Sequence, residues 1–147
     1  MKPFTNFCEQ KGFTLIEVVL SVAIISLLAS FSIPVYQSFQ IKNGVDVAAM
    51  TVAQTLRRAQ LLSQSMEEDD GWGVTVAAGS VTLFKGTSVG SEYDEVFTIS
   101  NGITVGGVTT FVFSKATGIP QTPGTLILAS DIVTRQIIVN AKGFVSY

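Results

Sequence analysis

The sequence predicts an α+β protein in which one long N-terminal helix packs on a small antiparallel β-sheet head. Residues 13–33 form an apolar run whose only ionisable side chain is Glu17. Apolar residues then recur every three or four positions as far as Met66, which is the spacing of one helix face. From Trp72 onward, short β-branched segments alternate with glycine turns. The expected segments are a leader (1–12), an apolar membrane helix (13–36), an amphipathic continuation (37–66) and a β-rich head (67–147).

The apolar run has the length of a membrane span. Its roughly 21 residues give a helix of about 31 Å, which matches the hydrocarbon thickness of a bilayer. A carboxylate in that environment costs roughly 2.5 kcal/mol or more, so an intramembrane acid indicates a function. Glu17 is therefore the first candidate functional residue.

The residues around Glu17 match a known signal. Gly-Phe-Thr-Leu-Ile-Glu, from Gly12 to Glu17, followed by an apolar helix, resembles the type III signal of type IV prepilins and type II secretion pseudopilins. The resemblance implies cleavage after Gly12 by a prepilin peptidase, N-methylation of the new terminus at Phe13, and extraction of the chain from the membrane into a filament. Pro34 falls where many members carry a helix-loosening proline, which implies a kink there.

Simple electrostatics gives Phe13 and Glu17 a joint role. Cleavage would create an α-amino group on Phe13 with an ordinary pKa near 8, and Glu17 lies four residues further along the helix. The amine and carboxylate can therefore pair within one chain. In a filament, the resemblance implies that the amine pairs with Glu17 of a neighbour. Leaving either charge unpaired in an apolar filament core would cost several kcal/mol, which favours subunits in register.

Charge also predicts orientation. Lys2 and Lys11 precede the apolar run, and the next basic residue is Lys42, so the leader is expected in the cytoplasm and the head across the bacterial inner membrane. A secretory signal peptide or a plain membrane anchor is the alternative interpretation. A signal peptide has a shorter apolar core of about 7 to 15 residues and a small-residue cleavage site after it. The long run with an acid near its start favours the prepilin interpretation.

The amphipathic segment is expected to cover the head. Its polar positions lie opposite its apolar ones, and Gly44 is a point where the helix is expected to be softer. A free surface helix or a coiled-coil dimer is the alternative, but barely three heptads with several alanines make a weak zipper. The expected core-facing residues are Val45, Ala49, Val52, Leu56, Ala59, Leu62 and Met66.

The head is expected to contain seven short strands and two acidic loops. The strands are expected at 72–78, 81–85, 95–100, 110–114, 125–129, 134–140 and 144–147, with turns at Ala78-Gly79, Asn101-Gly102 and Gly106-Gly107. Four consecutive acids, 67–70, should end the helix and form a solvated loop, because acids disfavour a helix C-terminus. A second acidic patch, 91–95, has the same interpretation. Neither run has the alternating ligand spacing of a calcium loop, so no metal site is predicted.

Composition argues against catalysis. The chain has 147 residues, a net charge of -2, no histidine and one cysteine. That cysteine, Cys8, lies in the expected leader, so the mature chain would have no disulfide. The common zinc sets, Ser-His-Asp triads and Cys-His pairs are excluded. We therefore predict no catalytic residue and no cofactor; a membrane enzyme with carboxylate chemistry in the acidic loops is a third alternative.

The C-terminal half suggests a branch of the family. Residues 113–120, 125–128 and 137–145 resemble the tail of GspH/FimT-like minor pilins, although many of those end in a Gly-Arg pair and Gly143 here is followed by Phe144. Some FimT-type relatives bind DNA through basic residues near that tail. After Met66 the sequence has four basic residues and eight acids, a net charge of -4, so nucleic acid is not an expected partner. Phe144 and Tyr147 are expected to belong to the core. The basic residues are Lys85, Lys115, Arg135 and Lys142, and the acids are Glu67, Glu68, Asp69, Asp70, Glu92, Asp94, Glu95 and Asp131.

The predicted function is structural. We expect a minor pilin or pseudopilin that helps to initiate or cap a type II secretion pseudopilus or a type IV pilus. The alternative is a DNA-binding minor pilin of natural transformation. The resemblance implies four partners: membrane lipid before assembly, the prepilin peptidase, an inner-membrane assembly platform, and other pilins or pseudopilins in the filament.

Overall fold

The computed structural model of the chain describes residues 12–147, and for residues 31–35 it describes the backbone alone. One long helix precedes a β-rich head, which confirms the predicted α+β class. The chain divides into two compact units, the second being Ser38–Tyr147. The elements are α1 (Leu15–Gln64), the 3₁₀ turn η1 (Glu67–Asp69), and the strands β1 (Trp72–Ala77), β2 (Ser80–Lys85), β3 (Glu95–Thr98), β4 (Thr104–Gly107), β5 (Thr110–Phe113), β6 (Gly124–Ala129), β7 (Thr134–Val139) and β8 (Val145–Ser146).

In the second unit, the last part of α1 is buried on one wide face. Small residues dominate this face, which allows the helix to approach the sheets closely. The structure confirms five of the predicted core positions but not Met66, which is 51% exposed and lies beyond the helix end at Gln64 in a left-handed conformation. Leu62 is half-buried. The buried residues are Val45, Ala48, Ala49, Val52, Ala53, Leu56 and Ala59.

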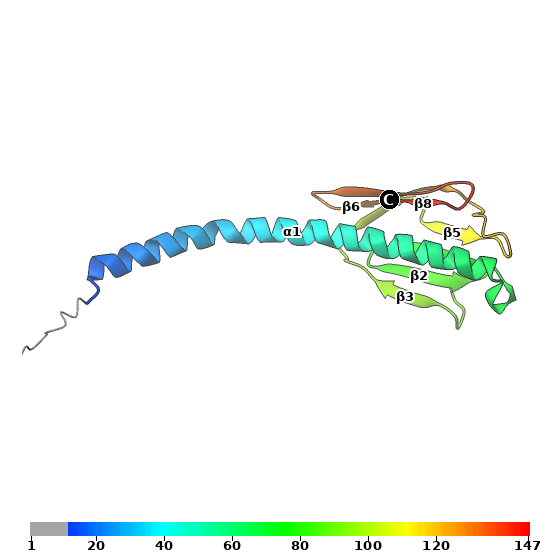
Figure 1. The fold of residues 1–147 in the computed structure, drawn as a ribbon, viewed down its shortest axis with the longest axis horizontal. Helices are drawn as coiled ribbons and strands as arrows, with labels where there is room; N and C mark the ends of the chain where they lie inside the picture. Colours follow the sequence, from blue (N-terminus) through cyan, green and yellow to red (C-terminus); the bar gives the residue numbers. More distant parts are fainter. Residues whose placement is uncertain (1–11) are drawn as a thin grey trace, which may run out of the picture. The chain divides into compact units, whose positions relative to one another are not determined.

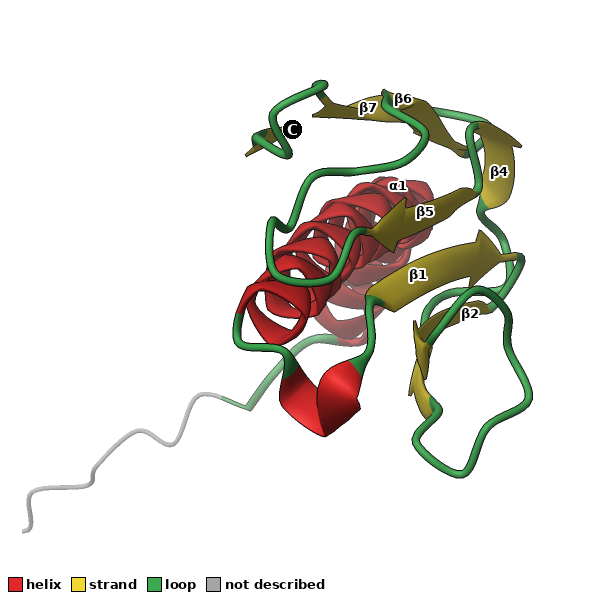
Figure 2. Cartoon of the chain, turned by 90° about the vertical axis from the view of Figure 1, so that its right-hand side faces the viewer, coloured by secondary structure: helices red, strands yellow, loops and turns green. Residues whose placement is uncertain are grey.

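Two antiparallel sheets pack against this helix face. The first has the order β3-β2-β1-β5 and the second the order β4-β6-β7-β8. Figure 1 shows β2 and β3 on one side of this part of α1, and β6 and β8 on the other. Figure 2 looks along the helix and shows it in the angle between the sheets. The buried core draws apolar side chains from the helix and from both sheets, so the head depends on α1 for its stability.

The two sheets are connected by a strand that changes partner. β4 pairs with β6, whereas β5 pairs with β1, and only Val108 and Thr109 separate β4 from β5. At this switch the Val108 N–H donates to the Thr125 carbonyl at 3.0 Å, and the Val76 N–H donates to the Thr109 carbonyl at 2.8 Å. Beyond Val76 the end of β1 therefore has no strand on its β5 side, although Ala77 still pairs with Ser80 of β2 on the other side.

The first sheet packs an aromatic side chain over a glycine. Gly73 in β1 pairs with Phe84 in β2, and a Cβ added at Gly73 would lie 2.4 Å from the Phe84 ring. Phe84 is fully buried, although it does not belong to the main core. The missing side chain of Gly73 thus makes the space that the ring occupies.

Most strand predictions are confirmed, with one element missed. Turns at Ala78-Gly79 and Asn101-Gly102 occur as expected. Gly106 and Gly107, however, lie in β4 rather than in a turn, and the sequence analysis assigned no strand there. The reason is physical: glycines favour turns, but here the pairing with β6 stabilises an extended conformation.

Candidate functional site

The predicted cleavage site lies just before the helix. Gly12 and Phe13 precede the first helical residue, Leu15, and both are exposed; Phe13 is 83% exposed. A Cβ added at Gly12 would have no atom within 4 Å. A protease needs an accessible backbone outside a helix, and this segment offers one. Cleavage between these residues and methylation of Phe13 stay predictions.

Glu17 lies in the first turn of α1, where the structure reveals a local role. The Glu17 N–H donates to the Thr14 hydroxyl oxygen at 3.3 Å, so Thr14 is the N-cap of the helix. Thr14 and Glu17 have the spacing of a capping box, in which a threonine is followed three residues later by a glutamate. A carboxylate in the first turn also interacts favourably with the helix dipole. This role was not predicted, although the Thr-x-x-Glu pattern in the sequence is its signal.

Serine residues along the first part of α1 donate their hydroxyl groups in hydrogen bonds to the helix backbone. Ser21, Ser26 and Ser30 each donate to the carbonyl four residues earlier at 2.8 Å. Each such bond removes a polar group from the helix surface. The side chains left to face outward are large and apolar. The most exposed are Leu15, Ile16, Leu20, Ile25, Leu27 and Leu28.

Two sequence-based expectations concern the membrane segment. In the part of the chain that the structure describes, no helix combines the length and apolar character needed to cross a membrane. The span predicted for residues 13–33 stays a prediction. The helix assignment continues through Pro34, whose side chain lies outside the described ones, so the kink at Pro34 also stays a prediction.

Three of the four basic residues of the head, Lys85, Lys115 and Arg135, lie next to acids. Two ion pairs join α1 to the sheets: Arg58 with Glu95 at 2.6 Å, and Arg135 with Asp46 at 2.7 Å. Arg135 therefore already has an anionic partner where a phosphate would need to bind. Among the described residues, no observation gathers the four basic residues of the head into one cluster. The geometry gives no support to nucleic-acid binding.

The acidic run after α1 is exposed to solvent, as expected, and two of its acids also form ion pairs. Lys115 contacts Asp69, and Lys85 lies 3.9 Å from Glu68. The hydrogen bond and charge of Lys115 hold the pKa of Asp69 below its ordinary value. The Tyr93 hydroxyl donates to Glu68 at 3.2 Å, and this bond raises the pKa of Tyr93. Within residues 12–147 no three acidic or cysteine side chains are placed to hold a metal ion.

The C-terminal aromatics differ from expectation. Phe144 is 67% exposed and Tyr147 is 56% exposed, so the prediction that they belong to the core is wrong. Phe144 follows a turn in which Gly143 has a positive φ of 82°, and this turn directs it outward. Tyr147 instead lies beneath the Arg57 guanidinium, 5.7 Å from the ring centre, and Arg57 donates to the Val145 carbonyl at 3.3 Å. Arg57 thereby attaches the C-terminus to the helix.

Comparison with known proteins points to the same N-terminal segment. The family described as the prokaryotic N-terminal methylation motif matches residues 9–33. A type IV major fimbrial protein FimA from Dichelobacter nodosus is 51% identical over 43 residues, covering 26% of this chain and 27% of that protein. Another FimA from the same organism is 36% identical over 92 residues, covering 58% of this chain and 56% of that protein. The matches thus span about a quarter to a half of these relatives. No solved structure matches the chain.

Proposed function

We propose that this chain is a type IV pilin-like subunit whose membrane-anchored precursor is cleaved between Gly12 and Phe13 and assembled into a filament as a minor subunit. The proposal assigns residues 13–36 to the membrane and then to the filament core. The β-rich head would lie outside the inner membrane and meet neighbouring subunits. The prepilin peptidase and an inner-membrane assembly platform are the partners that this route requires.

The observation that carries the proposal is the surface of the first part of α1. Its serine hydroxyls are bonded within the helix and its large side chains are apolar and exposed. Such a surface is unfavourable in water, so it calls for lipid or for the helices of other subunits. The single acid of this stretch, Glu17, lies at its start, one turn from the amine that cleavage would create on Phe13.

The finer role is a minor subunit that initiates or caps the filament. The C-terminal resemblance to GspH/FimT-like proteins supports a minor pilin or pseudopilin, whereas the relatives named above are major fimbrial proteins whose matches cover 26% and 58% of this chain. A type II secretion pseudopilus is our first assignment and a type IV pilus our second. In either filament, N-methylated Phe13 and Glu17 would set the register, and Pro34 would loosen the helix during packing.

The N-terminal mass of the protein tests this proposal directly. Protein is extracted from membranes of cells with and without a prepilin peptidase, and its N-terminal peptide is measured by mass spectrometry. We expect a chain beginning at N-methylated Phe13 only when the peptidase is present. A leader retained in both strains, or a cut after the apolar run, would reduce the protein to an anchored or secreted domain.

Substitution of the acid tests the assembly step separately. We expect Glu17→Ala to insert into the membrane normally but to be lost from sheared filaments, because the Phe13 amine of an incoming subunit would have no carboxylate partner. Ser21→Ala, one turn further along the helix, is the matched control and should assemble as the wild type does. Filament and membrane fractions are compared by immunoblotting. Normal incorporation of Glu17→Ala would remove the role assigned to Glu17.

A further inference from the structure

The head has four sheet edges, and three of them are protected. Unprotected edges invite pairing with other chains, so proteins usually cover or charge them. Beside β5, the Gln121 N–H donates to the Val112 carbonyl at 2.8 Å, so residues 119–121 cover that edge. On β8, the Arg57 guanidinium donates a hydrogen bond to the Val145 carbonyl. β3 begins with the charged residue Glu95.

The fourth edge, β4, has none of these protections. Its sequence is Thr-Val-Gly-Gly, without a charge, and no described segment outside its sheet forms a hydrogen bond with it. The Val108 N–H bonds to the Thr125 carbonyl, and in an antiparallel pair every second residue of a strand forms such bonds with the same neighbour. Thr104 and Gly106 therefore direct their N–H and C=O groups toward β6. Val105 therefore turns its N–H and C=O toward the open side.

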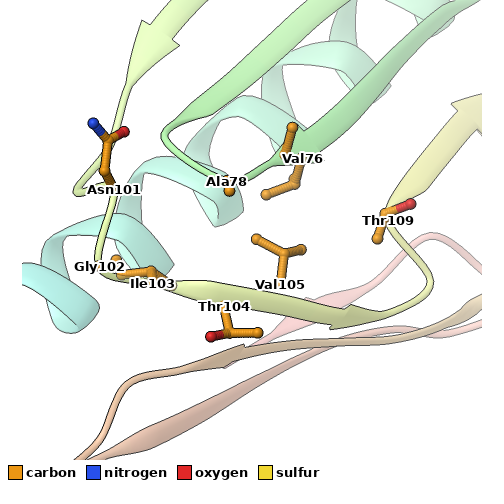
Figure 3. A pocket seen from close by; sticks show the side chains of 9 residues that line it. Val76, Ala78, Asn101, Gly102, Ile103, Thr104, Val105 and Thr109 are labelled. Carbon is orange, nitrogen blue, oxygen red and sulfur yellow. The ribbon is translucent and has the colours of Figure 1, made fainter.

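A cavity of about 590 Å³ adjoins this open edge. It lies between β4 and the end of β1, where the strand that pairs with β1 departs to the second sheet (Figure 3). Nine residues line it and none is charged. The side chains of Val76, Ile103 and Val105 supply apolar contacts, while Asn101 is at the rim (Figure 3). The cavity thus lies beside the end of β1, in line with the position that β5 occupies beside the rest of that strand.

We propose that β4 is a peptide-binding edge: an extended, uncharged segment of a partner protein pairs with β4 as a fifth strand and places one aliphatic side chain in this cavity. Strand addition uses main-chain hydrogen bonds for affinity and alternate side-chain pockets for specificity. The residue opposite Val105 has its N–H directed at Val105 and its side chain directed inward. The absence of charge in the lining selects against acidic and basic segments.

A second copy of this chain fits the cavity less well. Pairing of two β4 strands would offer only Val105 of the copy to the cavity, because Gly106 and Gly107 have no side chain, and valine is smaller than isoleucine or leucine. The occupant that fits is a segment with a larger aliphatic residue.

Binding of a defined peptide tests the inference on the full chain in detergent. The probe is a capped, fluorescein-labelled hexapeptide with one isoleucine among threonines, and fluorescence anisotropy reports binding. We expect saturable binding, weakened about tenfold or more when the isoleucine nitrogen is methylated or the isoleucine is replaced by glycine, since each change removes one main-chain bond or the buried side chain. Amide NMR shifts should concentrate at β4 and around Val76.

Protein variants complete the design. Ala78→Trp introduces a large ring at an exposed position on the cavity and should weaken binding about tenfold or more. Ala141→Trp makes the same change in an exposed turn outside the lining and should leave affinity within about twofold. Four results would overturn the inference: no saturable binding, equal binding of the N-methylated peptide, shifts centred on β3, or a β4-linked dimer of the chain itself.

Discussion

At the scale of single residues, Glu17 has a local role at the start of α1 and a second, proposed role after cleavage. In the precursor the helix start is stabilised locally, since Thr14 caps it and Glu17 interacts favourably with its dipole. Cleavage before Phe13 would add a positive charge one turn away and give the same carboxylate a new partner. The acid is therefore compatible with a folded precursor and does not need the filament to be tolerated.

Ser63 is the most connected buried polar side chain of the head. Its hydroxyl oxygen accepts a hydrogen bond from the Trp72 N–H at 2.8 Å, and its O–H donates to the Ala59 carbonyl at 2.8 Å. The backbone carbonyl of Ser63 accepts the Ala116 N–H. These bonds connect the end of α1 to the start of β1 and to the β5–β6 connection. Sequence periodicity does not predict this role, because a serine at a core position reads as an interruption of the apolar face.

We expect Ser63→Ala to destabilise the head by about 1 to 3 kcal/mol. The substitution leaves the buried Trp72 N–H without its acceptor, and an unsatisfied buried donor costs roughly that much. Urea unfolding of the full chain in detergent, followed by Trp72 fluorescence, measures the change. Ser65→Ala, at an exposed hydroxyl two residues on, should change stability by less than about 0.5 kcal/mol. Equal stability of the two variants would contradict the role of Ser63.

At the scale of elements, the helix and most strands were predictable and β4 was not. Three-to-four spacing from Val45 to Ala59 follows directly from burial of one face, so it is visible in the sequence. β4 has only one apolar side chain that faces inward, Val105, and two glycines, so alternation cannot reveal it. The cavity beside β4 was equally unpredictable, because it arises from the change of strand partner at Val108 and Thr109 rather than from any residue pattern.

The loop between β2 and β3 depends on one carboxylate. Asp94 accepts the Gly90 N–H at 2.6 Å and the Ser91 hydroxyl at 2.7 Å, and these bonds lower the pKa of Asp94. A carboxyl group whose pKa is lowered by folding stabilises the folded loop above its ordinary pKa, near 3.9, and loses that effect as pH falls through the lower folded value. The Gly90 amide signal should therefore stay constant from neutral pH to about 4 and change below it.

Asp94→Asn isolates this effect at neutral pH. The neutral amide is a weaker acceptor for the two donors, so the Gly90 amide should exchange with solvent faster than in the wild type. Asp131→Asn, an exposed acid in the turn between β6 and β7, should leave Gly90 unchanged. A Gly90 amide that shifts well above pH 4, or that exchanges equally in both variants, would show that Asp94 does not order the loop.

At the scale of the whole molecule, the chain combines two parts with opposite demands on solvent. The first part of α1 exposes large apolar side chains, whereas the unit Ser38–Tyr147 buries its apolar residues in a core of its own. The ion pairs Arg58–Glu95 and Arg135–Asp46 are half-exposed, so each contributes at most about 1 kcal/mol. Burial of the helix face, not charge pairing, is therefore the main source of stability in the head.

This division predicts where the chain can be shortened. A chain beginning at Ser38 keeps every helix residue of the core, so it should remain monomeric in water. Its unfolding temperature should lie within a few degrees, on the order of 5 °C, of that of the full chain in detergent.

A chain beginning at Val52 lacks Val45, Ala48 and Ala49, and the sheets would lose the side chains that cover them. Loss of the Val45 side chain costs about 1.5 to 3 kcal/mol of transfer free energy and loss of each alanine methyl group about 0.8 kcal/mol, whereas total stabilities are only about 5 to 15 kcal/mol. The shorter chain should therefore be unfolded or strongly destabilised by circular dichroism. Equal unfolding temperatures for the chains that begin at Ser38 and at Val52 would mean that the sheets, and not α1, hold the core together.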